Sequence, residues 1–250
     1  MEINKIYNED CYTVLKQMPD GCVDLMLQDT PFGVTQNDWD IAPDFEKMWP
    51  EWLRVGKENC AYIFFGTHPF VCDLINSNRN IFRYDLIWYK ALGTGFLNAN
   101  KMPMRNHESI LIFYRKLPVY NPQKGVGVRK AGKRNNTRTN SNYGKFSAES
   151  AGRYDDNGIR HPQSVLDFTN GDRTTEQDHP TQKPIDLIRY LILTYSNKGD
   201  LVFDGYSGSG TTAAASIKEK RNFIVCELKE KYYKKSCKRI KEDLTSQQLF

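Results

Sequence analysis

One segment near the C-terminal end, Leu201-Val-Phe-Asp-Gly-Tyr-Ser-Gly-Ser-Gly-Thr-Thr-Ala-Ala-Ala215, constrains the fold of this chain more than any other. Its apolar start predicts a buried strand, and its alanine-rich end predicts a helix. The glycines between them allow a sharp turn at which a ligand can approach backbone N–H groups. Only the forty residues 211–250 follow the last of these glycines, too few for a complete sheet. Strands from the N-terminal part of the chain must therefore complete it.

Short apolar runs alternate with amphipathic segments along the rest of the chain. Near-continuous hydrophobic runs predict strands of a sheet covered on both faces, and apolar residues at helical spacing predict helices. This alternation is typical of an α/β fold with a mostly parallel sheet. We expect strands at residues 3–7, 23–28, 61–65, 82–88, 109–114, 201–204 and 222–226, and helices at 45–55, 69–76, 184–195, 211–219 and 229–245.

The pattern stops between Leu117 and Asp178. Residues 115–160 contain eleven Lys and Arg and three acidic residues, a formal charge of +8, whereas the whole chain carries +5 and the remainder is therefore −3. A basic segment with few apolar residues is a loop or small appendage that attracts polyanions; a merely solvated loop is the alternative interpretation. We interpret residues 117–178 as an insertion into one domain formed by residues 1–116 and 179–250.

Composition excludes several other classes of protein. With 39% apolar and 26% charged residues, the chain can bury a core, which excludes a disordered protein and a disulfide-stapled miniprotein. No window approaches the roughly 18 apolar residues of a membrane span, and the acidic N-terminal segment does not resemble a secretion signal. The six cysteines form no CxxC pair and the four histidines no metal-ligand spacing, so we expect free thiols and no metal.

Asp204 decides which nucleotide-like cofactor suits the glycine turn. A carboxylate there repels the pyrophosphate of NAD but attracts the ammonium and sulfonium groups of S-adenosylmethionine. Gly208, Gly210 and Ala213 also match the GxGxxA dinucleotide fingerprint, and Glu227 ends the next predicted strand, where an acid can hold ribose hydroxyls. The electrostatics favour the methyl donor. The structural alternative is that Asp204 only caps a helix beside a tight turn.

A second informative turn, Asp29-Thr30-Pro31-Phe32, follows the predicted strand at 23–28. Pro31 holds Thr30 in an extended conformation, so the Asp29 carboxylate and the Thr30 carbonyl become adjacent acceptors beside the Phe32 ring. Such a pair suits the exocyclic amine of a nucleobase, because accepting both hydrogens localises the nitrogen lone pair for attack on a methyl group. An ordinary turn is the alternative interpretation.

The two turns together resemble the motifs of the DNA amino-methyltransferases, which act on adenine N6 or cytosine N4. Asp29–Phe32 resembles the catalytic D-P-P-[YF] motif, and Asp204–Thr212 resembles the D-P-F-x-G-S-G-T-T cofactor motif. Asn8-Glu-Asp10-Cys11 is similar to the family's strand-end acid that contacts the cofactor adenine. Arg105–Phe113 resembles its strand before the recognition insertion, and His179-Pro-Thr-Gln-Lys-Pro184 matches its H-P-T-Q-K-P motif. The order of these motifs is the family's beta-type permuted order.

The resemblance implies a circularly permuted, Rossmann-like, S-adenosylmethionine-dependent methyltransferase fold. It also implies site-specific methylation of double-stranded DNA, with the target base flipped out and stacked on Phe32. Because an Asp at the first catalytic position usually accompanies adenine N6, we expect adenine, with cytosine N4 as the alternative. The implied catalytic residues are Asp29, Thr30, Pro31 and Phe32. The implied cofactor-binding residues are Asp10, Cys11, Asp29, His179, Thr181, Lys183, Asp204, Gly205, Tyr206, Ser207, Gly208, Ser209, Gly210, Thr211, Thr212 and Glu227.

The insertion is the expected reader of the target sequence. Its cations can bind phosphates or guanine edges, and those we single out are Lys124, Arg129, Lys130, Lys133, Arg134 and Arg138. The polar loop before the insertion contains weaker candidates, Asn98, Asn100, Lys101 and Arg105, for which simple solvation is the alternative. As partners we name double-stranded DNA, a second copy of the chain and a cognate restriction endonuclease. As location we expect the cytoplasm of a bacterial or phage-infected cell, without a membrane anchor.

Two departures from the family motifs affect these expectations. Thr30 replaces the first proline of the catalytic motif, and Gly205-Tyr206 replaces Pro-Phe in the cofactor motif. Both changes remove a rigid proline, so we expect slower turnover and a looser cofactor turn. Because of Thr30, a DNA-binding relative without catalytic activity is an alternative function. Because of the glycine fingerprint, an NAD-dependent oxidoreductase is another. Transfer of a labelled methyl group, and titration with S-adenosylhomocysteine and NAD, distinguish the three functions.

Overall fold

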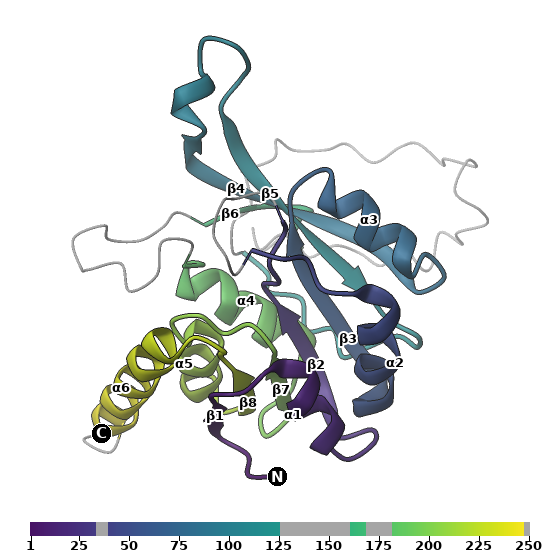
Figure 1. Ribbon diagram of the computed structural model, residues 1–250, viewed down its shortest axis with the longest axis vertical. Coiled ribbons are helices and arrows are strands. Elements are labelled where there is room, and N and C mark those ends of the chain that lie inside the picture. Colours follow the sequence, from purple (N-terminus) through teal and green to yellow (C-terminus); the bar gives the residue numbers. More distant parts are fainter. Residues whose placement is uncertain (34–39, 126–160, 169–181, 248–250) are drawn as a thin grey trace, which may run out of the picture.

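The computed structural model of the protein describes residues 1–33, 40–125, 161–168 and 182–247. An eight-stranded sheet runs through this part of the chain (Figure 1). Its spatial order is β1-β8-β7-β2-β3-β5-β4-β6, and β5 alone is antiparallel to its neighbours. The predicted mostly parallel sheet is therefore confirmed. The strands are β1 (Lys5–Tyr7), β2 (Val23–Gln28), β3 (Gly56–Gly66), β4 (Phe82–Thr94), β5 (Arg105–Phe113), β6 (Val165–Asp167), β7 (Leu201–Asp204) and β8 (Asn222–Cys226).

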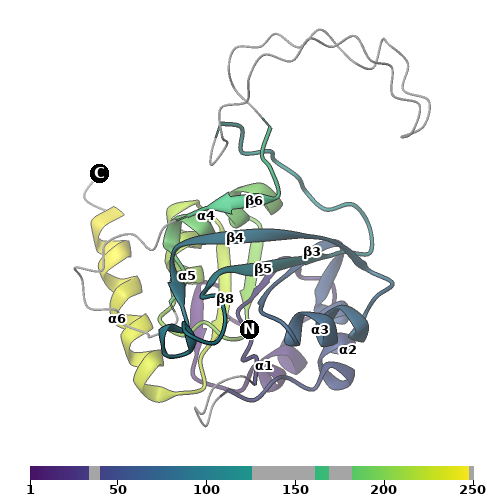
Figure 2. The same ribbon diagram turned by 90° about the horizontal axis from the view of Figure 1, so that it is seen from above.

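Helices cover both faces of this sheet (Figure 2). One face carries α1 (Cys11–Gln17), α2 (Phe45–Val55) and α3 (Phe70–Ser77), and the other carries α4 (Ile185–Tyr195) and α5 (Thr211–Lys218), with α6 (Glu230–Gln247) packed on α5 and β1. Successive residues of a strand point to opposite faces. Met26 accordingly packs in the layer of Trp52, whereas Leu27 packs in the layer of Leu191, and all four side chains are buried.

The predicted elements match the structure where burial produces a strong pattern. Strands β2, β7 and β8 and helix α2 have the predicted bounds, and the other predicted elements differ at their ends. Strands β4 and β5 are longer than predicted because their outer residues pair with each other outside the buried sheet, where no hydrophobic run is needed. The sequence pattern does not predict α1, β6 or the short 3-10 helix η1 (Phe96–Asn98), each of which has at most seven residues.

The segments that flank the basic part of the predicted insertion are attached to the sheet domain. The Asn121 N–H donates to the Thr194 carbonyl at 2.7 Å, at the end of α4. On the other side, β6 pairs in parallel with β4, and Trp88 Nε1 donates to the Phe168 carbonyl at 2.8 Å. Residues 126–160, which contain most of the basic excess, lie outside the described residues. The boundaries 1–116, 117–178 and 179–250 stay a prediction.

Strands β2 and β7 lie side by side where the chain changes direction across the sheet. From β2 the chain passes through α2 to β3 on one side, and from β7 it passes through α5 to β8 on the other. The two strands are parallel, with Leu25 opposite Val202 and Met26 opposite Phe203, so their carboxyl ends open at one edge. Ligands of open α/β sheets bind at such a switch point. The turns that follow β2 and β7 therefore meet there.

Three general features bear on the expectations from composition. All six cysteines are free thiols, of which Cys11, Cys60 and Cys226 are buried and Cys72 is exposed. A search of the described residues for three or more metal-ligating side chains in one group finds none. Within the same residues, every helix is too short or too polar to span a bilayer.

Candidate active site

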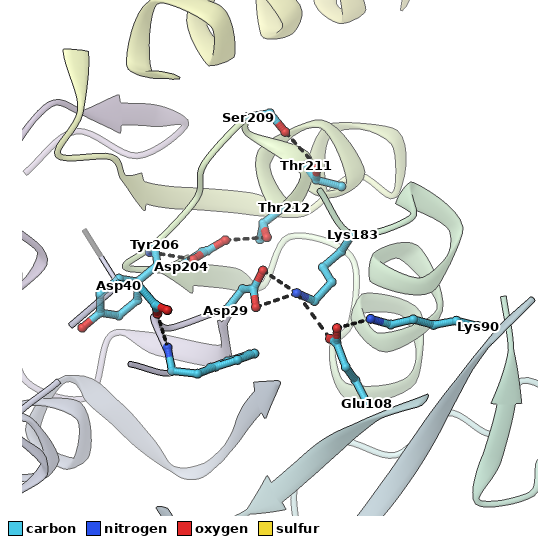
Figure 3. A network of polar contacts seen from close by, with 11 residues as sticks. Asp29, Asp40, Lys90, Glu108, Lys183, Asp204, Tyr206, Ser209, Thr211 and Thr212 are labelled. Carbon is cyan, nitrogen blue, oxygen red and sulfur yellow. Dashed lines mark hydrogen bonds and ion pairs between the residues drawn. The ribbon is translucent and has the colours of Figure 1, made fainter. Parts of the chain in front are cut away.

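A cavity of about 550 Å³ opens at the carboxyl ends of β2 and β7 and is lined by the turns that follow both strands. The two carboxylates on which the sequence analysis depends, Asp29 and Asp204, therefore share one cavity, in which Figure 3 shows them close together. The predicted site residues that line it are Asp10, Cys11, Asp29, Thr30, Pro31, Phe32, Lys183, Asp204, Gly205, Tyr206, Ser207, Gly208, Ser209, Thr211, Thr212 and Glu227.

The remaining predicted site residues lie elsewhere. Gly210 precedes α5 but does not line the cavity. Lys124 is exposed, and it follows a segment bound to the C-terminal end of α4, away from the cavity. The others, His179, Thr181, Arg129, Lys130, Lys133, Arg134 and Arg138, lie outside the described residues.

The Asp29 carboxylate ends a chain of alternating charges (Figure 3). Both of its oxygens accept hydrogen bonds from Lys183 Nζ at 2.7 Å. The same ammonium lies 3.5 Å from Glu108 Oε2, and Lys90 binds the other oxygen of Glu108. Burial lowers the pKa of Lys183, but Asp29 and Glu108 outweigh it and raise the pKa overall. Lys183 is thus a buried ammonium held between two carboxylates, and Asp29 keeps 28% of its side-chain surface exposed.

The turn after Asp29 is held by Asp40 and by ring packing. Asp40 Oδ1 accepts hydrogen bonds from the N–H groups of Phe32 at 2.8 Å and Gly33 at 2.9 Å. The Phe32 ring packs on Phe70 with centroids 5.0 Å apart. Thr30 is 2% exposed, and its hydroxyl has no hydrogen-bond partner in the described part of the chain. The Phe32 ring and the backbone at Phe32 and Gly33 are therefore held in place beside Asp29.

The Asp204 carboxylate organises the glycine turn. Its Oδ1 accepts from the Tyr206 N–H at 2.8 Å, and its Oδ2 accepts from the Thr212 hydroxyl at 2.6 Å, at the start of α5. Burial nevertheless raises the pKa of Asp204 to about 7, because these hydrogen bonds only partly offset the loss of solvation. The structural alternative is therefore correct in part: Asp204 does brace the turn, and it also faces the cavity.

Gln28 ties the two turns together, a role that the sequence analysis missed. Its Nε2 donates to the Phe203 carbonyl at 3.0 Å, and its Oε1 accepts from the Gly205 N–H at 3.1 Å. A proline at 205 would lack this donor. A Cβ at 205 would also lie 2.9 Å from the Cys11 Cβ, so only glycine fits there without a shift. The looser turn expected from Gly205 stays a prediction, and this glycine allows an additional bond between β2 and the turn after β7.

Two further acids fix the ends of neighbouring strands. Glu227, after β8, accepts from the N–H groups of Gly208 at 2.9 Å and Lys229 at 2.8 Å. Burial raises its pKa above the ordinary value. Asp10, after β1, caps α1, because its Oδ1 accepts from the N–H groups of Tyr12 and Thr13. Both acids line the cavity, so they combine this bracing with a position open to a ligand.

Several functional residues were not found from the sequence. Gln28 is a polar residue in an apolar strand directly before Asp29, and Glu108 lies in the predicted strand run Arg105–Phe113. A polar side chain in a buried strand is a signal from which both residues could have been found. Asp40 and Lys90 carried no such signal. Asp40 lies eight residues after Phe32 in a segment without a periodic pattern, and Lys90 acts through its contact with Glu108 on another strand.

The balance of charge in the cavity restricts its ligand. Eight carboxylates and three ammonium groups line it, and Ser207 adds a buried hydroxyl without a hydrogen-bond partner among the described residues. A cationic ligand with hydroxyl groups fits this donor and acceptor set, whereas a pyrophosphate does not. The charged lining residues are Glu9, Asp10, Asp29, Asp40, Asp44, Glu108, Asp204, Glu227, Lys47, Lys183 and Lys229.

Comparison with known proteins supports the family that the motifs resemble. A family profile described as DNA methylase, of the N6/N4 type, matches residues 23–238. The type II methyltransferase M1.MboII of Moraxella bovis is 29% identical over 260 residues, which cover 93% of this chain and 94% of that protein. The DNA adenine methyltransferase YhdJ of Escherichia coli K12 is 29% identical over 254 residues, which cover 96% and 83%.

Solved structures agree on the fold. The crystal structure of an M1.HpyAVI–SAM complex has a TM-score of 0.64 at 19% identity and covers 94% of this chain and 98% of its own. The cytosine-N4-specific PvuII DNA methyltransferase has a TM-score of 0.65 at 15% identity and covers 96% and 90%. The predicted methyltransferase fold is therefore confirmed over nearly the whole chain.

Proposed function

This chain belongs to the DNA methylase family of the N6/N4 type, and from this premise we propose that it transfers a methyl group from S-adenosylmethionine to an amino nitrogen of a base in double-stranded DNA. The observation that carries the proposal is the single cavity lined by both Asp29 and Asp204. One carboxylate follows the strand of the catalytic motif, and the other follows the strand of the glycine turn. The methyl donor and the base that accepts the methyl group would thus bind in the same cavity.

The acid-rich lining supports S-adenosylmethionine rather than NAD as cofactor. When bound, this cofactor supplies a methyl group made electrophilic by a sulfonium. Asp204 would hold its cationic end, Glu227 its ribose hydroxyls and Asp10 its adenine amine, while the glycine turn approaches it with backbone groups. The M1.HpyAVI structure, which contains SAM, has the same fold and supports this assignment.

The catalytic turn orients the acceptor nitrogen. The target base leaves the duplex and stacks on Phe32, because a paired base cannot reach a cavity of this kind. Asp29 and the Thr30 carbonyl accept the two amino hydrogens, which localises the nitrogen lone pair toward the methyl carbon. An ionised carboxylate has about four lone-pair sites, so Asp29 can accept the amine while Lys183 uses two of them. The nitrogen would form its bond to the methyl carbon as the bond from that carbon to the sulfonium sulfur breaks, so that S-adenosylhomocysteine leaves. The methylated nitrogen then releases one proton to solvent, and no covalent enzyme intermediate is involved.

Adenine N6 is the acceptor that we propose. An Asp at the first catalytic position usually accompanies adenine in the family that the motifs resemble, and YhdJ, of similar sequence, is named a DNA adenine methyltransferase. PvuII methyltransferase, of similar fold, is cytosine-N4-specific, so cytosine N4 is the second candidate.

The basic insertion is the part that we propose to read the target sequence. Its cations, and above all Arg129, Lys130, Lys133, Arg134 and Arg138, supply phosphate and base contacts. The name of M1.MboII, a type II methyltransferase, supports action at a short specific sequence and a matching restriction endonuclease as partner. Bacterial relatives support a cytoplasmic location. Pairing of two copies stays a prediction.

The experiment incubates the protein with labelled S-adenosylmethionine and bacterial DNA, then identifies the modified nucleoside by mass spectrometry and the modified sequence by modified-base sequencing. We expect N6-methyladenine at one short sequence. N4-methylcytosine would overturn the choice of base, and DNA and cofactor binding without methyl transfer would overturn the activity.

Two variants tie this result to the site. Asp29→Ala should abolish transfer while cofactor affinity changes little, because Asp29 contacts the acceptor base. Asp20→Ala is the matched control, since the Asp20 side chain is 79% exposed and lies before β2, at the other edge of the sheet. Full activity of the Asp29 variant would remove this carboxylate from the reaction.

A further inference from the structure

Strands β4 and β5 continue as a hairpin beyond the body of the sheet (Figure 1). The pairing of β5 with β3 ends at Gly66 and Ser109, whereas its pairing with β4 continues to Thr94 and Arg105. Gly66 is the carboxyl end of β3, a parallel neighbour of β2, so the hairpin projects from the edge at which the cavity opens. Glu108, at the base of the hairpin, itself lines the cavity.

The tip of this hairpin exposes large apolar side chains. Leu97 is 96% exposed and Phe96 is 78% exposed, both in the short helix η1. Leu92, Met102 and Met104 are 56%, 59% and 40% exposed. Single exposed apolar residues are ordinary, but five within one projecting turn indicate a partner surface.

The charges of the tip identify the kind of partner. Residues 92–105 contain Lys101 and Arg105 and no acidic residue. Both cations are exposed, beside the apolar side chains of the same turn. Apolar wedges flanked by Lys or Arg are typical of proteins that enter a DNA duplex, because bases present apolar faces between rows of phosphates. A duplex that delivers a base into the cavity must also lie across the edge from which this hairpin projects.

We propose that Phe96 and Leu97 enter the duplex beside the target base and occupy the space that this base leaves in the stack, while Lys101 and Arg105 bind the flanking phosphates. The inference rests on the proposed function, because only a base that moves into the cavity leaves such a space. Filling it lowers the free energy of the flipped state and so speeds transfer from a paired target.

The test compares the double variant Phe96→Ala/Leu97→Ala with the unaltered protein in single-turnover methylation. One substrate is a duplex with the methylated sequence, and the other is the same duplex with an abasic site opposite the target base. An unpaired base is easier to extrude. We expect the variant to be about 10- to 100-fold slower on the paired duplex and within about twofold of normal on the abasic one.

Ile3→Ala is the matched control, since Ile3 is an exposed apolar residue, 52% exposed, that precedes β1 at the amino ends of the parallel strands. It should leave both rates unchanged. Equal losses of rate on the two substrates, or no loss on either, would overturn the inference. A change of oligomeric state in sedimentation caused by the double variant would also overturn it, because the tip would then form a contact between two copies of the chain.

The unaltered protein separates this test from that of the proposed function. If it methylates neither duplex, the proposed function fails, whatever the variant does. Fluorescence of 2-aminopurine at the target position then tests the hairpin without turnover: the unaltered protein should raise the fluorescence by unstacking the base, and the double variant should not.

Discussion

At the scale of single residues, the ionisation of Asp29 depends on one neighbour. Burial raises the pKa of Asp29, and the nearby Lys183 is the largest influence that lowers it, while Glu108 raises it. The carboxylate must be ionised to accept an amino group. In the proposed reaction, Lys183 is therefore a positioning residue that keeps Asp29 charged and aligned. Glu108 in turn holds Lys183, and it binds Lys90 on its other side.

Replacing Lys183 by Met tests this arrangement through the pH dependence of single-turnover methylation. Without the ammonium the pKa of Asp29 rises further, so the rate should require a higher pH and recover partly as the pH increases. The variant should also lose unfolding free energy, toward the low end of the about 3–5 kcal/mol of a broken buried ion pair, because Asp29, which is 28% exposed, loses its partner while Glu108 keeps Lys90. Urea unfolding measures this loss.

Lys57→Met is the control for the same change of side chain. Lys57 pairs with Asp24 at 2.6 Å, but its side chain is 43% exposed. A pair this open to solvent contributes about 0–1 kcal/mol, so the control should remain stable and keep the normal pH profile. An unshifted profile for the Lys183 variant would show that Lys183 does not set the charge of Asp29.

The pKa of Asp204, about 7, makes a second prediction about pH. Below pH 7 the carboxyl is largely neutral and attracts a cationic cofactor weakly, so affinity for S-adenosylmethionine should rise as the pH increases from 6 to 8. Calorimetry in buffers of different ionisation enthalpy should detect proton release on binding. Asp204→Asn should bind weakly at every pH, and a pH-independent affinity in the unaltered protein would contradict the prediction.

The same pKa affects stability with the opposite sign. Asp204 binds a proton more tightly in the folded protein than in the unfolded chain, where its pKa is the ordinary 3.8. Protonation of Asp204 therefore stabilises the fold at low pH, and this stabilisation is lost as the pH rises toward 7. In the absence of cofactor, Asp204→Asn should therefore unfold at a higher temperature than the unaltered protein at pH 8 and lose this advantage at pH 4.

At the scale of elements, the glycine turn depends on the packing of α6 against it. Gly210 has φ of +76°, and a Cβ there would lie 2.9 Å from the Cβ of Ser236 in α6. Ser236 Oγ also donates to the Gly208 carbonyl at 2.9 Å. The turn and the helix are thus in direct contact, so the position of α6 fixes the shape of the cofactor side of the cavity.

Gly210→Ala should destabilise the protein more than Gly199→Ala. Both glycines have positive φ, +76° and +85°, so both variants pay about 1 kcal/mol for backbone strain. A Cβ at Gly199 meets open space, whereas one at Gly210 presses on α6. The difference in unfolding free energy between the two variants therefore measures the contact with α6. Equal losses of unfolding free energy in the two variants would mean that α6 moves away from the new Cβ without a loss of stability.

Which elements could be predicted follows from how each is stabilised. The strands β2, β7 and β8 are largely buried on both faces and leave near-continuous apolar runs in the sequence, so their predicted bounds are correct. Strand β6 has three residues at an edge, and α1 begins at a cap, Asp10, that the analysis had assigned to the cofactor. Short elements held by long-range pairing leave no periodic signal.

The residues of the site also divide into those with a local sequence signal and those without one. Asp29 and Asp204 could be predicted because motif and turn chemistry are local, and the switch point brings them together. The bracing contacts could not, although Glu108 stands out as an acid in a buried strand, because the ion pairs among Lys90, Glu108 and Lys183 form only when separate segments fold together. The roles of the residues in the cavity stay a proposal.

At the scale of the whole molecule, positive and negative charge fall on different parts of the sequence. The cavity lining is acidic, whereas residues 115–160 carry a formal charge of +8. DNA affinity should therefore fall steeply with salt, and cofactor affinity only weakly. The double variant Lys133→Ala/Arg134→Ala should reduce the slope of log affinity for DNA against log salt by about two. An unchanged slope would refute phosphate contacts by these two residues.

The attachment of the basic segment at two points on one body has a consequence for divergence. Asn121 fastens one end to α4 and β6 fastens the other to β4. The entropy lost in joining two fixed anchors grows only with the logarithm of the length between them, about 0.6 kcal/mol for each doubling. Under the proposed function, residues between the anchors can thus be exchanged, added or deleted at little cost to the stability of the sheet domain, so that related proteins can come to recognise new DNA sequences while the cavity is kept.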